Sequence, residues 1–196
     1  MSRSGAVQRK TNETEVTVRW ELDGTGEARI ATGVGFLDHM LAHVARHGRF
    51  DLEVSATGDL HIDAHHTAED VALTMGQALH QALGERRGIQ RMGHAIVPMD
   101  EALALVAIDL GGRPYTACDL PLTGEMLGTL PTEMVEHVLL SLATEGRFNL
   151  HARFLAGTND HHKVEALFKA LARALDAATA LDPRLGDTIP STKGSL

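Results

Sequence analysis

Hydrophobic and polar residues follow two periodicities over the first 90 positions of the chain. Apolar and polar residues alternate in short runs bounded by turn residues such as Asp23-Gly24, which predicts β-strands. Elsewhere apolar residues recur at helical spacing and stop before Gly48 and Gly84, which predicts α-helices. The predicted elements are, in chain order, a β-hairpin of strands 15–22 and 27–31, a helix at 36–46, strands at 50–54 and 60–62, and a helix at 67–83.

The same kinds of element return in a similar order after a junction at residues 89–93. Thr132, which follows Pro131, is predicted to cap the first helix of this part. The predicted elements are strands at 95–97, 102–110 and 115–120, a helix at about 132–144, a strand at 148–155, and a long helix from 161 to about 181. The sequence therefore predicts two α+β half-repeats, residues 1–90 and 91–184, and a tail at 185–196 that is rich in Gly, Ser, Thr and Pro.

Two stretches about a hundred residues apart carry the same histidine arrangement. The matched features are His39 and His137, the Gly-Arg-Phe runs at 48–50 and 146–148, and the His-His-x-x-Glu clusters at 65–69 and 161–165. The single histidines lie 98 positions apart and the clusters 96, so a two-residue difference in one loop explains the mismatch. An internal duplication follows.

Composition and charge narrow the range of functions. The chain has 196 residues, 43% of them hydrophobic, which is enough to bury a core. Cys118 is the single cysteine, so an intramolecular disulfide framework and a cysteine-rich metal site are excluded. The formal net charge of −8 disfavours nucleic acid as a partner. No apolar run is long enough for a membrane span, and Met1–Lys10 lacks the apolar core of a signal peptide, so a cytoplasmic location is expected.

The spacing inside the clusters suits metal coordination. A histidine and a glutamate four residues apart on a helix can chelate one ion from adjacent turns, whereas the second histidine of each doublet points elsewhere. If a pseudo-two-fold axis relates the halves, the sites are reciprocal. The first site then comprises His39, His66, His161 and Glu165, and the second comprises His65, Glu69, His137 and His162.

Three imidazoles and one carboxylate per ion do not identify the metal. Mn²⁺, Fe²⁺, Co²⁺, Ni²⁺ and Zn²⁺ all accept such ligands. Open coordination positions favour catalysis over a structural role. The unmatched histidines are expected to be structural: His43, His61, His80, His94 and His151. His47 is the exception, because it lies two helical turns from His39.

Four motifs together closely resemble imidazoleglycerol-phosphate dehydratase of histidine biosynthesis, and the resemblance runs from about Val7 to Lys193. The motifs are Gly-Val-Gly-Phe-Leu-Asp-His-Met at 33–40, Asp-Ala-His-His-Thr-Ala-Glu-Asp at 63–70, Pro-Met-Asp-Glu-Ala at 98–102 and Asn-Asp-His-His-Lys-Val-Glu at 159–165. The fold expected is α+β and internally duplicated, with a mainly antiparallel four-stranded sheet and two helices in each half and the helices packed between the sheets.

The resemblance implies a monofunctional enzyme that converts D-erythro-imidazole glycerol phosphate to imidazole acetol phosphate and water. It also implies two Mn²⁺ ions per active site, and a homo-oligomer of 24 subunits with active sites at subunit interfaces. The substrate proton lies on a carbon that bears a hydroxyl group and is not acidic enough for direct removal. The imidazole ring must therefore become an imidazolate, expel the hydroxide and give a diazafulvene-like intermediate before an enol forms and tautomerises.

The resemblance also implies roles for residues outside the eight metal ligands. Glu13 is the candidate for proton transfer, and His47 is carried as a second catalytic candidate. Asp38 and Asp63 are expected to orient ligand imidazoles, and Asp100 and Glu101 are left without a firm role. The residues expected to contact substrate are Glu13, His39, His47, His65, Glu69, Arg91, Arg113, His161, Lys163, Ser191, Thr192 and Lys193, with the arginines and the 191–193 segment on the phosphate.

Two other functions remain compatible with the ligands alone. A dinuclear metallohydrolase would release phosphate or cleave an amide and leave the carbon skeleton unchanged. A non-catalytic metal-storage cage would hold many ions per subunit and would not depend on Arg91 or Lys193.

Overall fold

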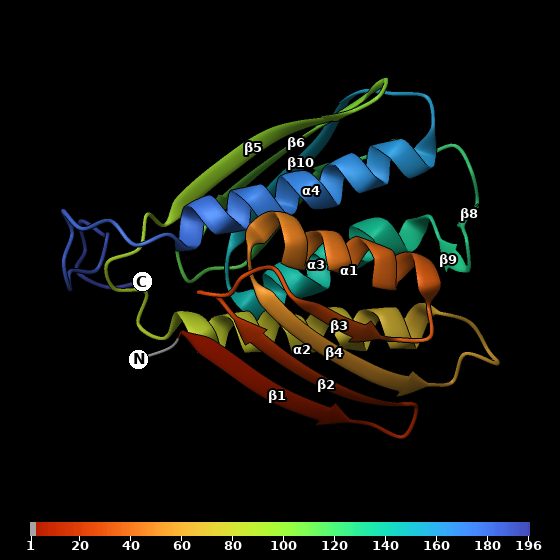
Figure 1. Cartoon of the computed structure of the whole chain (residues 1–196), viewed down its shortest axis with the longest axis horizontal. Coiled ribbons are helices and arrows are strands. Elements are labelled where there is room, and N and C mark those ends of the chain that lie inside the picture. Colours follow the sequence, from red (N-terminus) through yellow and green to blue (C-terminus); the bar gives the residue numbers. More distant parts are fainter. Residues whose placement is uncertain (1–2) are drawn as a thin grey trace.

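Two four-stranded sheets enclose a layer of four helices in the computed structural model, which describes residues 3–196 (Figure 1). The first half contains β1 (Ser4–Lys10), β2 (Thr14–Glu21), β3 (Ala28–Ala31), α1 (Gly35–Gly48), β4 (Asp51–Gly58) and α2 (His65–Leu83). The second contains β5 (Met92–Met99), β6 (Ala102–Asp109), β7 (Tyr115–Asp119), β8 (Met126–Leu127), β9 (Leu130–Pro131), α3 (Glu133–Gly146), β10 (Asn149–Ala156) and α4 (Asp160–Thr179). The predicted α+β class with helices between the sheets is confirmed.

The two large sheets have the same topology. Their strand orders are β1-β2-β4-β3 and β5-β6-β10-β7. In each sheet the first two pairs are antiparallel and the last pair is parallel. This shared topology is the structural counterpart of the duplication seen in the histidine motifs.

Matching glycines let the first strand of each sheet approach a helix closely. A Cβ atom on Gly5 would lie 2.0 Å from the carbonyl oxygen of Ala78, and one on Gly93 would lie 2.1 Å from that of Ala174. A side chain at either glycine would force strand and helix apart. Ala78 and Ala174 are 96 positions apart, the same offset as the two histidine clusters.

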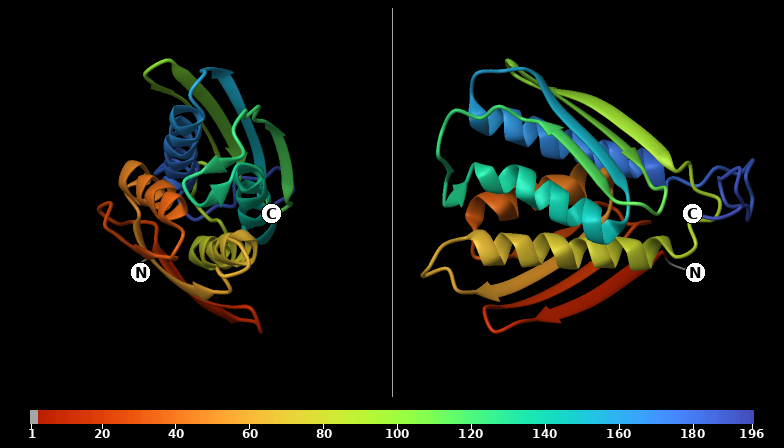
Figure 2. Two further views of the ribbon diagram at one scale, coloured as in Figure 1. Left: turned by 90° about the vertical axis from the view of Figure 1, so that its right-hand side faces the viewer. Right: turned by 180° about the vertical axis from the view of Figure 1, so that it is seen from behind.

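The helices of the two halves pair crosswise. α2 packs on β1 and β2, and α4 packs on β5 and β6. α1 then lies beside α4, and α3 lies beside α2, as Figure 2 shows from two sides. The first helix of each half therefore contacts the second helix of the other half. This exchange brings residues far apart in the sequence into contact, such as His39 with Glu165, which are 126 positions apart, and Glu69 with His137, which are 68 apart.

Aromatic side chains anchor the core beneath the helices. The rings of Trp20 and Phe50, both fully buried, meet edge to face with centroids 5.6 Å apart. Phe148, which belongs to the second Gly-Arg-Phe run, is equally buried. Burial of each large side chain contributes roughly 1.5–3 kcal/mol, which fixes the sheets against the helices.

The β-hairpin predicted for strands 15–22 and 27–31 is wrong. β2 pairs with β1 and β4, whereas β3 runs parallel to β4. The connecting loop crosses the start of β4, where Asp51 Oδ1 accepts hydrogen bonds from the backbone N–H groups of Thr25 at 2.7 Å and Glu27 at 3.0 Å. The Asp51 carboxylate thus accepts from backbone N–H groups of the loop, which would be paired between the two strands in a hairpin.

The strand predicted at 60–62 is also wrong, and β1 takes its place as the fourth strand. Both edges of β4 are already paired, so the following residues have no strand to join. The N–H group of Ile62 instead donates to the carbonyl oxygen of Asp59 at 2.8 Å, and Ile62 is 63% exposed. β1 was not predicted because most of its residues are polar.

Thr132 occupies the predicted N-cap position of α3, but its side chain does not cap the helix. The Thr132 hydroxyl donates to the carbonyl oxygen of Gly124 at 2.8 Å and does not bond to the helix N-terminus. It holds the loop that precedes β8.

The C-terminal segment packs against the connection between the halves. The N–H group of Gly88 donates to the carbonyl oxygen of Thr188 at 2.9 Å. The exact boundaries at residues 90 and 184 stay predictions, and Met1 and Ser2 of the first predicted half lie outside the described residues. From residue 3 to residue 196, no helix is long and apolar enough to cross a membrane.

Candidate metal and phosphate site

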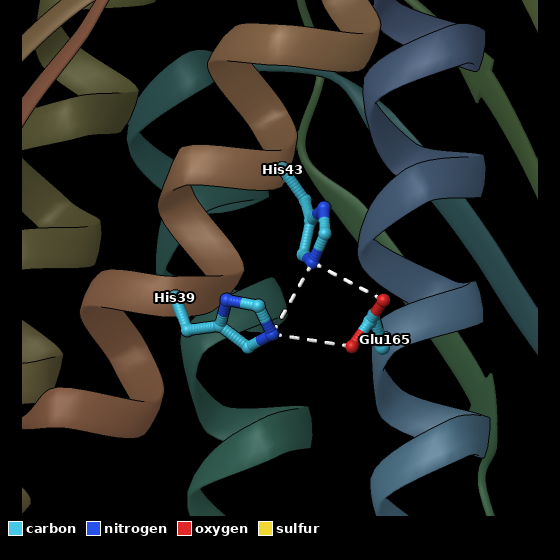
Figure 3. Close-up of side chains that lie close together, drawn as sticks. All are labelled: His39, His43 and Glu165. Carbon is cyan, nitrogen blue, oxygen red and sulfur yellow. Dashed lines mark hydrogen bonds and ion pairs between the residues drawn. The ribbon is translucent and has the colours of Figure 1, made fainter.

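Four side chains from α1 and α4 form what we call the α1/α4 cluster: His39, His43, His161 and Glu165 (Figure 3 shows all but His161). The Nε2 atoms of His39 and His161 each lie 3.2 Å from Glu165 Oε2. The Nε2 atom of His43 lies 3.3 Å from Oε1 of the same carboxylate. The predicted grouping of His39, His161 and Glu165 is thus present within one chain.

Helical spacing explains this geometry. His161 and Glu165 are four residues apart on α4, as His39 and His43 are on α1, so each pair projects from one helix face. The first turn of α4 is held by Asn159, whose side chain accepts a hydrogen bond from the backbone N–H of His162 at 3.2 Å. Contact between α1 and α4 then makes the two faces meet.

The electrostatics of the α1/α4 cluster keep Glu165 ionised. Burial raises the pKa of the Glu165 carboxyl, but hydrogen bonds from Lys169 and His39 and the nearby positive charges outweigh it and lower the pKa to about 2. The Lys169 Nζ atom lies 2.7 Å from Glu165 Oε1. Burial lowers the pKa of His43 to about 4, so this imidazole is neutral near pH 7.

Three side chains from α2 and α3 form a second group, the α2/α3 cluster: His65, Glu69 and His137. Their ligand atoms all lie within 4.8 Å of one another, and His137 Nε2 is 2.9 Å from Glu69 Oε1. The rings of His65 and His137 are tilted, with centroids 5.0 Å apart. The reciprocal grouping of these three residues is again present within one chain.

His66 and His162, the fourth ligand predicted for each site, do not join the clusters within one chain. The Nδ1–H group of His66 donates to Asp59 at 2.9 Å, and that of His162 donates to Glu101 at 2.8 Å. These hydrogen bonds raise the pKa of both histidines. A carboxylate on Nδ1 leaves Nε2 as the atom suited to coordinate a metal, which is the arrangement common among metal-binding histidines.

The donors fit a divalent cation. Each cluster offers imidazole nitrogens and a carboxylate oxygen, a set that suits Mn²⁺, Fe²⁺, Co²⁺, Ni²⁺ or Zn²⁺. Three ligand atoms converge in the α2/α3 cluster, and three also converge among His39, His43 and Glu165. The clusters therefore have the chemistry and the spacing of incomplete metal sites.

The two residues expected to move protons lie in different places. The carboxylate of Glu13 is more than half exposed and lies 3.8 Å from His66 Nδ1. The ring of His47 stacks on that of His43, with centroids 5.4 Å apart, one turn beyond the α1/α4 cluster. Burial and the charges of Lys169 and Arg173 lower the pKa of His47. Within one chain, Glu13 therefore lies beside His66, and His47 lies beside His43.

The expected phosphate-contacting residues line a separate cavity of about 260 Å³. Its lining includes Arg91, Arg113, Ser191, Thr192 and Lys193. Guanidinium, hydroxyl and ammonium groups are donors that suit a phosphate.

Arg91 is held at this cavity by a two-bonded ion pair. Its Nε and Nη2 atoms donate to the two carboxylate oxygens of Asp109 at 2.7 and 3.0 Å, and its Nη1 atom donates to the carbonyl oxygen of Pro190 at 2.8 Å. The guanidinium therefore also ties the C-terminal segment to the cavity.

Three other residues from the sequence analysis have local partners. Lys163 is buried, and its Nζ atom lies 2.7 Å from Asp160 and 2.8 Å from the carbonyl oxygen of Pro121. Asp38 accepts from the Thr32 hydroxyl at 2.6 Å. Asp63 accepts from the backbone N–H of His65 at 2.8 Å and so braces the start of α2. Within one chain these contacts stabilise loops and helix ends and do not orient imidazoles.

Sequence reasoning missed four residues that the structure adds. His43 and Lys169 each lie one turn after a predicted ligand on the same helix, and this spacing could have identified them. Asp59 and Asp109 gave no such signal, because each reaches its partner from a different element.

Known proteins of similar sequence share one name. A sequence profile described as imidazoleglycerol-phosphate dehydratase matches residues 32–175. The imidazoleglycerol-phosphate dehydratase of Chloroflexus aurantiacus is 60% identical over 194 residues, covering 99% of this chain and 95% of the relative. The enzyme of that name from Granulibacter bethesdensis is 54% identical over 196 residues, covering all of both chains.

Solved structures of similar fold carry the same name. A crystal structure of imidazoleglycerol-phosphate dehydratase from Staphylococcus aureus matches with a TM-score of 0.83 and 35% identity, covering 91% of this chain and 99% of that one. IGPD from Pyrococcus furiosus in complex with (S)-C348 matches with a TM-score of 0.83 and 36% identity, covering 97% and 100%.

Proposed function

Because the chain belongs to the imidazoleglycerol-phosphate dehydratase family, we propose that its two histidine–carboxylate clusters hold two Mn²⁺ ions in each active site. Members of this family are hydro-lyases of histidine biosynthesis that act on a small molecule. This chain is a hydro-lyase of the same kind. The proposed reaction converts D-erythro-imidazole glycerol phosphate to imidazole acetol phosphate and water. We propose the cytoplasm as its location, where the single free Cys118 would stay reduced.

One observation supports the proposal most directly. Each cluster contains three of the four ligands predicted for one site, and the fourth, a histidine, is hydrogen-bonded to a carboxylate outside the cluster. The clusters lack His66 and His162 respectively, and both histidines are held by carboxylates elsewhere. A neighbouring copy of the chain can supply each missing histidine. This supports a homo-oligomer with active sites at subunit interfaces, for which we propose 24 subunits.

The metals, when bound, supply Lewis-acid chemistry that favours loss of the N–H proton from the substrate imidazole. His39, His161 and Glu165 would hold one metal ion, and His65, Glu69 and His137 would hold the other. Metal ions held at fixed positions would orient the substrate for reaction. The ring electrons then expel the hydroxyl group from the adjacent carbon and leave a diazafulvene-like species.

Glu13 is proposed to move the proton at the neighbouring carbon. Its carboxylate is exposed and lies beside His66, so it would reach the active site that His66 completes in a neighbouring chain. A carboxylate that is not buried in an ion pair can accept and return a proton. His47 is retained as a second candidate because it continues the row of imidazoles on α1.

The cavity lined by Arg91, Arg113 and residues 191–193 is proposed to hold the substrate phosphate. Arg91 offers its remaining N–H groups beyond those bound to Asp109 and Pro190. Lys193 adds a further positive charge. Fixing the phosphate sets the distance between the reacting carbons and the clusters.

The purified protein, supplied with Mn²⁺ and substrate, should form imidazole acetol phosphate. Absence of this product would reject the proposal. Release of inorganic phosphate with an unchanged carbon skeleton would instead support a metallohydrolase. Uptake of many ions per subunit, with no loss of function in Arg91 and Lys193 variants, would support a storage cage.

A further inference from the structure

Glu165 and Glu69 occupy equivalent positions in the duplicated halves, yet their surroundings differ. The Glu165 side chain is 9% exposed, and its Oε1 atom contacts Lys169 Nζ at 2.7 Å and His43 Nε2 at 3.3 Å. Only Oε2 faces His39 and His161. Glu165 therefore presents one oxygen to a metal, and a fixed cation holds the other.

Glu69 has no such support. Its side chain is 36% exposed, and its Oε1 atom lies 2.9 Å from His137. By the offsets of the duplication, Leu73 stands where Lys169 stands in α4, and Ser141 stands where His43 stands in α1. Between residues 3 and 196, no lysine or arginine forms an ion pair with Glu69. Both of its carboxylate oxygens can serve a metal.

We propose that the two metal sites are inequivalent, and that the Glu69 site binds its ion more tightly and fills first. This inference rests on the proposed function, because it assumes that both clusters hold Mn²⁺. Lys169 is the residue that makes the difference, and the duplication supplies its natural counterpart in Leu73.

Lys169 acts on the Glu165 site through its charge. Lys169 neutralises Glu165, so a divalent cation meets no net negative charge there, whereas Glu69 offers a full negative charge. The ammonium group repels a cation bound beside Glu165, which weakens binding there. The free energy of binding therefore favours the Glu69 site.

Stepwise loading has a functional consequence. At limiting Mn²⁺ the assembly would carry an ion at the Glu69 site and little at the Glu165 site. Since the proposed reaction needs both metal ions, turnover would follow occupancy of the weaker site. The enzyme would then respond to Mn²⁺ over the concentration range in which the Glu165 site fills.

The test is a titration of the metal-free protein with Mn²⁺, with free Mn²⁺ read from its electron paramagnetic resonance signal. The wild type should show two classes of site whose Kd values differ by about tenfold or more. Lys169→Leu should tighten the weaker class and bring the two Kd values together. Leu73→Lys should weaken the tighter class by a similar factor.

Arg173→Leu provides the matched control, because Arg173 lies one turn beyond Lys169 on α4 and its ion pair is with Asp176. It should leave both Kd values unchanged. Two equal classes in the wild type, or looser binding in Lys169→Leu, would overturn the inference. Absence of Mn²⁺ binding by the wild type would reject the two-metal function itself. If Lys169→Leu fails to fold, the Leu73→Lys variant decides alone. An unchanged Kd of the tighter class in that variant would refute the inference.

Discussion

His162 and Glu101 form a hydrogen-bonded pair in which Nδ1 of the imidazole lies 2.8 Å from Oε2 of the carboxylate. His66 and Asp59 form the equivalent pair at 2.9 Å. The carboxylates come from unrelated places, since Asp59 follows β4 and Glu101 lies in the turn between β5 and β6. The halves thus reach the same orientation of the second histidine by different routes.

Replacing the carboxylate of this pair should weaken metal binding. Glu101→Ala removes the acceptor that fixes the His162 ring, and we expect a loss of about 10- to 100-fold in Mn²⁺ affinity at one site. Elemental analysis and a Mn²⁺ titration of the assembled protein would measure it. Glu53→Ala, which removes an exposed carboxylate on β4, is the control. Unchanged affinity in Glu101→Ala would show that His162 does not need this partner.

Sharing of sites between chains can be tested by mixing inactive variants. His39→Ala and His66→Ala each remove one ligand of the same predicted site, and each protein alone should lose most of its activity and metal. If His66 acts in a neighbouring chain, dissociated subunits that are mixed and reassembled will form some sites in which every ligand is intact. Recovery of activity on mixing supports the shared site. A mixture no more active than its components would contradict it.

The ion pair between Arg91 and Asp109 should govern phosphate binding. Asp109→Asn removes the charge that holds two guanidinium N–H groups, and we expect KM for the substrate to rise about tenfold with a smaller change in kcat. Asp109→Glu should restore part of the loss. Asp119→Asn is the control, because Asp119 is an exposed residue of the same sheet whose nearest ion-pair atom lies at 3.8 Å. A tenfold fall in kcat, as large as the rise in KM, would indicate a disturbed fold instead.

Acid should destabilise the metal-free protein through Glu165. Its folded-state pKa of about 2 lies below the ordinary value of 4.5, so the carboxylate stabilises the fold above pH 4.5. This contribution is lost as the pH falls from about 4.5 to about 2. Denaturant unfolding across this range should show a shallower pH dependence for Glu165→Gln than for the wild type. Asp187→Asn, at an exposed position of the tail, should keep the wild-type slope.

The close crossing of α2 and α3 should depend on Gly76. A Cβ atom at this position would lie 2.7 Å from the Leu142 carbonyl oxygen and 2.8 Å from the Gly146 nitrogen. Because backbone atoms cannot move aside easily, Gly76→Ala should lower the free energy of unfolding by about 1–3 kcal/mol. Gly35→Ala is the control, since a Cβ atom there meets nothing within 4 Å. Thermal unfolding of both variants would measure the difference. Equal stability of the two variants would contradict the prediction.

The elements that follow hydrophobic periodicity were predictable, and those that depend on their neighbours were not. The helices at α1, α2, α3 and α4 were all found, because each has an apolar face that the sequence shows directly. β1 was missed, because its polar residues hide a strand that only pairing with β2 stabilises. Residues 60–62 alternate like a strand but have no free edge to join.

The sequence by itself determined the duplication, the α+β class and the two sets of ligand candidates, because spacing along a helix fixes which side chains share a face. Only the tertiary structure decided that α1 pairs with α4 and α3 with α2, that His43 and Lys169 join Glu165, and that Asp59 and Glu101 turn His66 and His162 away. These contacts join residues from separate elements. Their geometry depends on how helices and loops pack, which no local pattern of residues specifies.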